Sequence, residues 1–560
     1  MTFEGELARY SRGWRGPAMA ALLAFAAGLP GLLAMPPLDR DESRFAQATA
    51  QMLETGDFTV IRYQDQPRFK KPVGIHWLQA ASVSLVSNPE DRQIWAYRIP
   101  SLLGAMLAAA ACAWGAAAFF GAEGGLLAGA MLASSFLLST EALIAKTDAV
   151  LCGTTTLAIA ALARLYAEAR DGPPAGRRAW LLFWISLGVA TLVKGPIGPL
   201  IAALTIAALV AMDRRTAWLG RLNWSWGLLI VAAIVGPWAG AVTVATDGGF
   251  WSAALAGDLA PKLAGGQEGH GAAPGYHTLL APLLAFPMTL LLPAAAVTAW
   301  RRWREPGVRF ALAWLVPAWI VFEAMPTKLV HYPLPAYGAL AWLAAAALGQ
   351  SLGARARWTG AGLASAVGVT LACGCFYLVS LYGDASDLPV ATVAGGLLAA
   401  AGLVGGVLLV RKAPRRAIVG AVGLGLAGHA ALAAGLAPRL SPLWLSERVE
   451  RAMARAQLLP EQGIADAPVS VAGYAEPSLV FALGTPTELA GPDDAAQAIS
   501  ENRPAVVEQR QEAQFRQALA GYRVQALLVA TVTGLDYSDG KTMTLRIYQA
   551  TPAAHRGALP

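Results

Sequence analysis

The chain has 560 residues, of which 56% are hydrophobic and only 14% are charged. Soluble globular proteins carry about 25% charged residues, so this deficit over the whole length indicates a protein of the lipid bilayer. The net charge of +7 comes from arginines that stand in short runs between apolar stretches. This pattern is typical of membrane loops, so we exclude nucleic acid as a partner and expect membrane lipids instead.

Apolar stretches of about 16 to 25 residues recur as far as residue 437, and each is long enough to cross a bilayer. The sequence therefore predicts an α-helical polytopic membrane protein with about thirteen transmembrane helices. Gly195 and Pro196 form a sharp break between two of the spans. We expect the spans near 17–35, 99–120, 124–142, 149–168, 179–194, 196–211, 225–245, 277–298, 309–325, 332–350, 359–382, 388–410 and 417–437.

Basic residues predict the orientation of these spans. If the N-terminal arginines lie in the cytoplasm, thirteen spans put every short arginine-rich loop on that side. The opposite face then carries a long first loop at 36–98 and a second loop at 246–276. We expect a transmembrane domain over 1–437 that includes both loops, followed by a smaller domain over 438–560 on the same outer face.

The segment 438–560 has the pattern of a small α/β domain. The turn Tyr537-Ser538-Asp539-Gly540 predicts a hairpin between two strands. The segment contains no nucleotide-binding glycine loop, and the whole chain lacks a P-loop motif, so we expect no nucleotide cofactor and no ATP-driven pump. The expected strands are Val469–Ala472 and Val524–Val532, and the expected helices are Ala495–Glu501 and Gln511–Gly521.

The first loop opens with charged residues directly after the first span. Asp41 stands between Arg40 and Arg44 at the bilayer surface, which suits a general base or an electrostatic anchor. The alternative is helix capping, in which Asp41 or Ser43 accepts hydrogen bonds from free backbone N–H groups. The amphipathic run Phe45–Leu53 is expected to lie along the membrane interface.

Further cations stand on the same outer face. The run Arg68-Phe69-Lys70-Lys71 suits a phosphate or diphosphate, although anionic lipid head groups offer the same contact. Such a cluster runs against the usual charge bias of the outer face, and this favours a functional role.

Asp148, Lys194 and Lys328 lie at the ends of spans on this face, where ionisable groups are costly and tend to mark a site. Any single lysine could instead extend to the head groups, but the convergence of several favours a shared anionic ligand.

The second loop contains Glu268 and His270. This pair suits a divalent metal ion or an acid and a base. Two residues are too few to define a metal site, so both alternatives stay open.

In their order and spacing these motifs resemble the polyprenyl-phosphate-sugar-dependent glycosyltransferases of the GT-C class. The resemblance is to the relatives of protein O-mannosyltransferases and of the lipid A aminoarabinose transferase. It covers about residues 20–350 and includes the thirteen-span layout with a periplasmic C-terminal domain. The matching pieces are Asp41-Glu42-Ser43-Arg44, Lys71-Pro72, Lys146-Thr147-Asp148, Lys194-Gly195-Pro196, Glu268-Gly269-His270, and Lys328 through Tyr332-Pro333-Leu334-Pro335.

The resemblance implies a role for each matching residue. Asp41 matches the acidic residue that the family requires for catalysis, and Asp148 matches a second acidic position. His270 matches a histidine in the family's second periplasmic loop, and that histidine can join a metal site. Arg44, Lys71 and Tyr332 match positions that contact the carrier phosphate, and Lys194 matches another basic position in the cavity. Lys328 lies in a matching motif and is also expected to bind the substrate.

Two departures concern the metal and the sugar. In the aminoarabinose transferases a glutamate that helps to hold the metal precedes the lysine matched by Lys71, and here that position is Lys70. A tyrosine two positions earlier is Arg68 here. A divalent metal and the identity of the sugar therefore stay open.

The function implied is a bacterial inner-membrane transferase with a periplasmic active site. It moves a sugar from a polyprenyl (undecaprenyl) phosphate to an envelope acceptor such as lipid A, another glycan or protein, with inversion at the anomeric carbon. The alternative is a transporter or flippase of a lipid-linked substrate. The polar residues gather at one face and not at the midplane, which favours the transferase.

Overall fold

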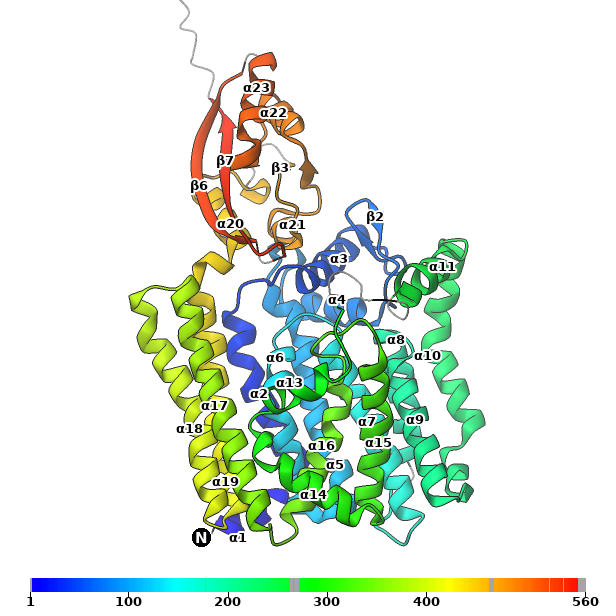
Figure 1. The fold of residues 1–560 in the computed structure, drawn as a ribbon. Coiled ribbons are helices and arrows are strands. Elements are labelled where there is room, and N and C mark those ends of the chain that lie inside the picture. Colours follow the sequence, from blue (N-terminus) through cyan, green and yellow to red (C-terminus); the bar gives the residue numbers. More distant parts are fainter. Residues whose placement is uncertain are drawn as a thin grey trace, which may run out of the picture.

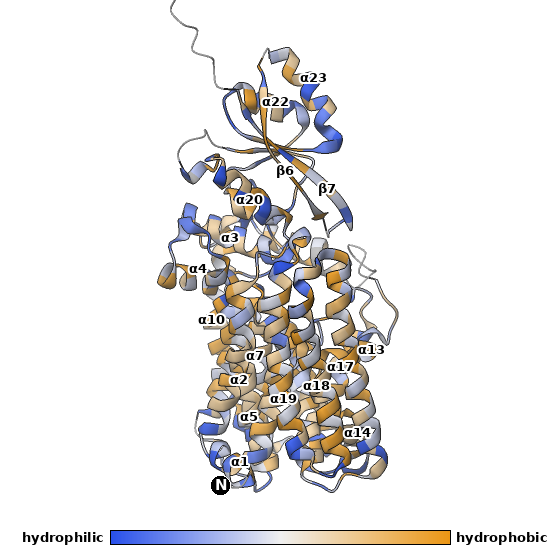
Figure 2. Ribbon diagram, turned by 90° about the vertical axis from the view of Figure 1, so that its left-hand side faces the viewer, coloured by the Kyte–Doolittle hydropathy of each residue, from blue (hydrophilic) through white to orange (hydrophobic). Residues whose placement is uncertain are grey.

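The computed structural model describes residues 3–176, 178–261, 265, 271–462, 468–522, 524–536 and 538–551. A tall bundle of helices carries a smaller domain with a β-sheet on one end, and the N-terminus lies at the other end (Figure 1). Hydrophobic residues cover the flanks of the bundle, while hydrophilic residues gather at its two ends and on the small domain (Figure 2). An apolar flank between two polar ends is the surface of a multi-pass membrane protein.

Eight helices of the described residues are long and apolar enough to cross a membrane, and the bent pair α13 and α14 brings the number to nine. Three shorter apolar segments accompany them, and α5 consists of two helical arms that meet at a kink at Gly121. Each of the about thirteen expected spans coincides with one of these segments, so the predicted multi-pass architecture is confirmed.

The helices of the bundle and its loops are α1 Phe3–Ser11, α2 Arg15–Ala34, α3 Asp41–Thr55, α4 Gly74–Val86, α5 Ile94–Ala133, α6 Phe136–Glu141, α7 Asp148–Glu168, α8 Ala179–Lys194, α9 Ile197–Asp213, α10 Trp224–Ala245, α11 Gly249–Ser252, α13 Tyr276–Leu284, α14 Leu292–Arg302, α15 Pro306–Ala324, α16 Tyr337–Leu348, α17 Ala354–Tyr382, α18 Leu388–Val410 and α19 Pro414–Ala430.

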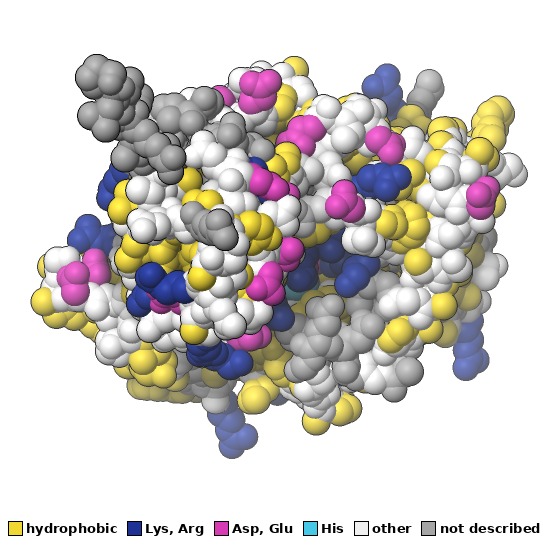
Figure 3. Space-filling model, turned by 90° about the horizontal axis from the view of Figure 1, so that it is seen from above, with side chains coloured by type: hydrophobic (Ala, Val, Ile, Leu, Met, Phe, Trp, Pro, Cys, Tyr) yellow, Lys and Arg dark blue, Asp and Glu magenta, His cyan; other side chains and the backbone are white. Residues whose placement is uncertain are grey.

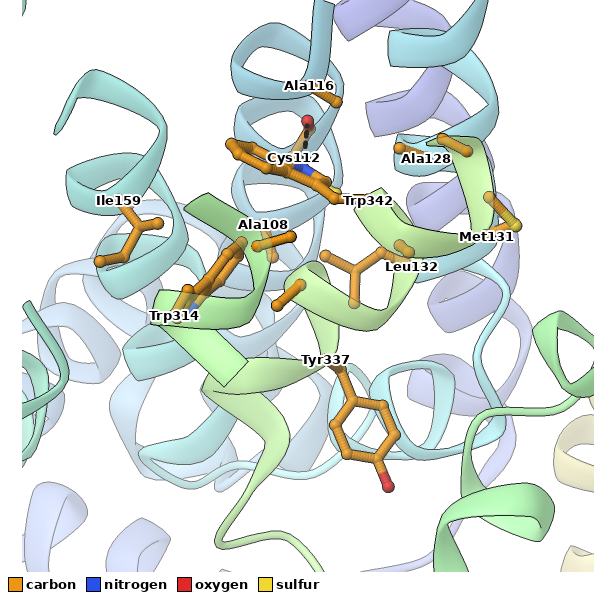
Figure 4. Close-up of a cluster of buried hydrophobic side chains, with 14 of the residues drawn as sticks. Ala108, Cys112, Ala116, Ala128, Met131, Leu132, Ile159, Trp314, Tyr337 and Trp342 are labelled. Atoms are coloured by element: carbon orange, nitrogen blue, oxygen red, sulfur yellow. Dashed lines mark hydrogen bonds between the residues drawn. The ribbon is translucent and has the colours of Figure 1, made fainter. Parts of the chain in front are cut away.

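Large aromatic side chains fit against small residues in the centre of the bundle (Figure 4). Trp342 is fully buried, and its indole N–H donates to the carbonyl oxygen of Cys112 at 3.1 Å. A Cβ atom at Gly338 would lie 2.3 Å from the ring of Trp314, so only glycine permits this approach. Close packing of this kind holds α5, α15 and α16 as one rigid unit beneath the outer loops.

The first loop folds over the outer end of the bundle. It contains α3, the short antiparallel pair β1 (Arg62–Tyr63) and β2 (Gln66–Pro67), and α4. The prediction that Phe45–Leu53 lies along the membrane interface is wrong, because most of this segment is buried inside the protein. Helix α21 of the small domain packs against α3 and removes it from the bilayer surface.

The small domain contains a five-stranded mixed sheet in the order β4-β3-β5-β7-β6. The expected strands coincide with β3 and β6, and the expected helices with α22 and α23. The expected hairpin joins β6 to β7, which pair antiparallel, although Tyr537 itself lies outside the described residues. The elements are α20 Leu445–Arg455, β3 Ser470–Ala472, α21 Pro477–Leu483, β4 Glu488–Ala490, α22 Pro492–Ser500, β5 Ala505–Glu508, α23 Glu512–Tyr522, β6 Ala526–Asp536 and β7 Lys541–Ala550.

Candidate active site

Seen from the end that carries the small domain, the surface is hollowed near its centre (Figure 3). Lys and Arg side chains gather in the hollow, with Asp and Glu beside them. Helices α3, α4 and α11 lie at this end of the bundle (Figure 1). The expected first and second loops therefore share one face.

Asp41 is the first residue of α3 and its side chain is exposed. The preceding Arg40 has a φ of 61°, which is uncommon for a residue other than glycine, and this turn directs the chain into the helix. The N-cap position belongs to Arg40, while the hydroxyl of Ser43 donates to the carbonyl oxygen of Leu38. The N-cap residue is thus neither Asp41 nor Ser43, the two capping candidates that the sequence analysis left open.

Cations surround Asp41. Desolvation by the surrounding protein raises the pKa of this carboxyl, but Lys71 and Lys146, followed by Arg68 and His331, outweigh that effect. The net result is a pKa below the ordinary value of 3.8. Asp41 is thus held in its ionised form, as a base or an orienting group requires.

Glu42, the neighbour of Asp41, has a different environment. It is fully buried and forms two bonds with Arg98, from Nε to Oε1 at 2.8 Å and from Nη2 to Oε2 at 2.7 Å. The same carboxylate accepts the backbone N–H groups of Leu38 at 2.8 Å and Ala145 at 2.7 Å. This buried pair fastens the start of α3 to the helices below it.

Two cations of the first loop flank one aromatic ring. The guanidinium of Arg68 lies 5.6 Å and the ammonium of Lys71 lies 5.8 Å from the centre of the Phe45 ring. Burial raises the pKa of the Tyr63 phenol to about 12, against the opposing effect of the charge of Arg44. The first loop therefore presents Arg68 and Lys71 on the side of Asp41.

A second ionic cluster lies just inside the bundle. Asp148 forms ion pairs with Lys194 and, at 3.8 Å, with Lys146. Lys146 also lies 3.0 Å from Glu141 and 3.3 Å from Nδ1 of His331. Nε2 of His331 is 3.6 Å from Asp148. The structure thus brings the predicted residues Asp148 and Lys194 into one network with two residues that the sequence analysis did not single out, Glu141 and His331.

Backbone geometry directs Lys194 into this network. Helix α8 ends at Lys194, and Gly195 follows with a φ of 65°. The ammonium of Lys194 also lies 5.6 Å from the centre of the Tyr332 ring, so these two predicted residues are neighbours.

Lys328 does not join this network in the structure. Its ammonium is buried and donates to the carbonyl oxygens of Glu323 at 2.7 Å and Met325 at 2.6 Å. It therefore satisfies the free carbonyl groups at the C-terminal end of α15. The predicted contact between Lys328 and a substrate stays a prediction.

The predicted metal ligands Glu268 and His270 lie outside the described residues. Within the described parts of the chain, no three His, Cys, Asp or Glu side chains are grouped so that they could hold a metal ion. Nearby, Thr327 donates to the carbonyl oxygen of Gly265 at 3.0 Å, which ties the second loop to the segment before α16.

Comparisons with known proteins identify a matching family model and a solved structure of similar fold. Residues 70–240 match the family described as dolichyl-phosphate-mannose-protein mannosyltransferase. The crystal structure of ArnT from Cupriavidus metallidurans bound to undecaprenyl phosphate superposes with a TM-score of 0.72 at 20% identity, over 94% of this chain and 96% of that one. The chain has the GT-C fold. The predicted fold class is therefore confirmed.

Sequence relatives of this chain include the undecaprenyl phosphate-α-4-amino-4-deoxy-L-arabinose arabinosyl transferases. The enzyme of Aeromonas salmonicida is 28% identical over 309 residues, or 55% of each chain. That of Shewanella sediminis is 26% identical over 344 residues, which are 61% of this chain and 60% of the relative. The GT-C chain thus matches between about half and three fifths of the length of these curated relatives.

Proposed function

We propose that this chain is a bacterial inner-membrane glycosyltransferase. It transfers a sugar from a polyprenyl phosphate to an acceptor of the cell envelope, for which lipid A is the first candidate. The observation that carries the proposal is the ionised carboxylate of Asp41 among Lys71, Lys146 and Arg68, at one membrane face of a GT-C bundle. The names of the sequence relatives supply the donor class, and the acceptor class follows from the family resemblance of the sequence motifs.

The cations of both clusters suit the carrier phosphate. Lys71 approaches from the first loop, and Lys194 approaches from inside the bundle beside Tyr332. The predicted contact of Arg44 with the phosphate stays a prediction. Charge-assisted hydrogen bonds to phosphate are strong, and they strengthen as negative charge develops on a departing phosphate. Asp148 holds Lys194 through an ion pair and thereby orients it.

The proposed reaction is a single displacement. An acceptor oxygen forms a bond to the anomeric carbon, the bond from that carbon to the phosphate oxygen breaks, and its electron pair leaves with the carrier phosphate. The configuration of the anomeric carbon is inverted. If the acceptor is a hydroxyl group, Asp41 takes its proton, and if it is a phosphate, Asp41 orients it.

A divalent metal stays a prediction for this site. Its two expected ligands lie outside the described residues, and Lys70 is exposed where relatives supply a glutamate.

We further propose that the hollowed face and the small domain are periplasmic. The arginine-rich loops support this orientation because such loops are retained in the cytoplasm. Helix α14 ends in Arg301 and Arg302 at the end of the bundle opposite to the small domain (Figure 1).

The experiment is a transfer assay with the purified full-length protein, an undecaprenyl-phosphate-linked aminoarabinose donor and lipid A. Mass spectrometry should detect the product, and lipid A from cells without the gene should lack the same addition. If neither lipid A nor another envelope glycan or protein changes in mass, the transferase is excluded. Movement of the carrier-linked sugar across vesicles without a new glycosidic bond would indicate the flippase instead.

A further inference from the structure

A second cavity, of about 500 Å³, opens at the end of the bundle opposite to Asp41. It lies between the kink of α5 and the ends of α7, α14, α16 and α19. Its lining contains Arg170, Arg302 and Arg415 together with Glu123 and Glu305. A cavity of this size is in the range of small-molecule sites, and it mixes both signs of charge.

The charged groups of this cavity are paired but remain accessible. Nε of Arg415 lies 2.7 Å from Glu123, and Arg302 pairs with Glu305. The side chains of Arg302 and Glu305 are 34% and 45% exposed. Exposed pairs of this kind are worth little, so a ligand that carries both charges can replace them. Guanidinium groups suit a phosphate, and carboxylates suit an ammonium.

An apolar cavity of about 400 Å³ adjoins the charged one, and Leu127 lines both. Helix α19 connects them, because Arg415 faces the first cavity and Ile418 the second. The apolar face of α1, with Phe3, Leu7 and Tyr10, covers the second cavity. Among its described lining residues, Glu6 is the single charged one.

We propose that the two cavities together bind one phospholipid of the membrane leaflet at this face. Its head group occupies the charged cavity and an acyl chain the apolar one. The mixed charge selects a head group with a phosphate and a primary ammonium, as in phosphatidylethanolamine. A purely anionic head group would leave two carboxylates without a partner, and a choline group has no N–H to donate to them. The site is separate from the proposed transfer reaction.

The test is native mass spectrometry of the purified full-length protein, titrated with phosphatidylethanolamine, phosphatidylcholine or phosphatidylglycerol. We expect wild type to retain phosphatidylethanolamine at a concentration about tenfold lower than either of the others, the ratio expected for one charge-assisted contact. Equal retention of all three lipids would overturn the proposal.

Two variants locate the lipid. Gly423 lines the apolar cavity, and a Cβ there meets no atom within 4 Å, so Gly423→Leu fills the cavity without a backbone clash. Arg302→Gln removes one phosphate contact. Each should weaken phosphatidylethanolamine binding about tenfold or more.

The matched controls are Gly362→Leu, where a Cβ also meets no atom within 4 Å, and Arg411→Gln, an exposed arginine. Neither residue lines the two cavities. Both controls should bind like wild type. Unchanged phosphatidylethanolamine binding by Gly423→Leu would overturn the proposal. If Arg302→Gln does not fold, the result for Gly423→Leu decides by itself. Equal losses in variants and controls would also overturn it.

Discussion

Asp41 and Glu42 are adjacent carboxylates with opposite environments. Asp41 is exposed and lies in the field of several cations, whereas Glu42 is buried in a bidentate pair with Arg98. A helix turns its successive side chains by about 100°, so one carboxylate can face the hollow while the next faces the bundle. The buried pair of Glu42 with Arg98 therefore fixes the position of the neighbouring Asp41.

We expect Asp41→Asn to abolish most transfer while leaving the melting temperature close to that of wild type. The substitution preserves size but removes the charge and the basicity, and asparagine supports a helix start about as well as aspartate. The measurement is sugar transfer by the purified variant together with its thermal unfolding. Near-normal transfer would contradict a catalytic role of Asp41.

Lys71→Ala should weaken use of the lipid donor by roughly ten- to a hundredfold, because a charge-assisted contact is lost.

Lys71→Ala should also shift the pH profile of sugar transfer. The pKa of Asp41 is lowered in the folded protein, so its carboxylate contributes to the free energy of unfolding above pH 3.8. This contribution is lost as the pH falls through the lowered pKa of the folded state. Without Lys71 the pKa of Asp41 rises, and the acid limb of the transfer profile should move to higher pH. An unmoved limb with wild-type kinetics would exclude Lys71 from the site.

Glu42→Ala should destabilise the protein by about 3–5 kcal/mol, because it leaves the buried guanidinium of Arg98 without its partner. The control is Glu54→Ala, since Glu54 is 40% exposed and its pair with Arg92 should contribute no more than about 1 kcal/mol. Thermal unfolding in detergent measures both variants. Similar melting temperatures for the two would contradict the anchoring role of Glu42.

At the level of elements, the small domain holds the helix that carries Asp41. Arg92 donates to Gln47 of α3 at 2.7 Å, to the carbonyl oxygen of Phe481 at 3.0 Å and to Thr485 at 3.0 Å. One guanidinium thus joins the first loop to the small domain. The hydroxyl of Ser478 also donates to Asp39, just before α3.

We expect Arg92→Ala to loosen this junction. The junction should become more sensitive to limited proteolysis, the melting temperature should fall, and transfer should decrease because α3 is no longer held. Arg516→Ala is the control, because Arg516 is 60% exposed and pairs with Glu512 within one helix. If the two variants behave alike in proteolysis and in transfer, the small domain does not position α3.

The sequence predicted the elements that depend on local signals. Apolar runs of sufficient length predicted the spans, and Gly195 predicted the break that directs Lys194 into the second cluster. The burial of α3 was not predictable in this way, because its cover α21 belongs to a distant part of the chain. The capping of α15 by Lys328 was missed for a related reason, since a lysine near a span end has the same local pattern whether it binds a ligand or a backbone carbonyl.

At the scale of the whole molecule, the orientation can be tested at the C-terminus. A C-terminal alkaline phosphatase fusion should be active, because the small domain shares a face with the first loop and the arginine-rich loops lie at the other end. A fully expressed but inactive fusion, with an active cytoplasmic reporter at the same position, would reverse the orientation.

The contact between Asp39 and Ser478 also sets an order of events during biosynthesis, because 439 positions separate the two residues. At about 5–20 residues per second, the ribosome needs about 20–90 s to reach the second partner after making the first. During that interval the spans can insert while α3 still lacks its cover. A chain that stops early would then keep Asp41, the proposed catalytic carboxylate, but not the domain that holds it in position. Completion of the last domain thus determines when a newly made molecule becomes active.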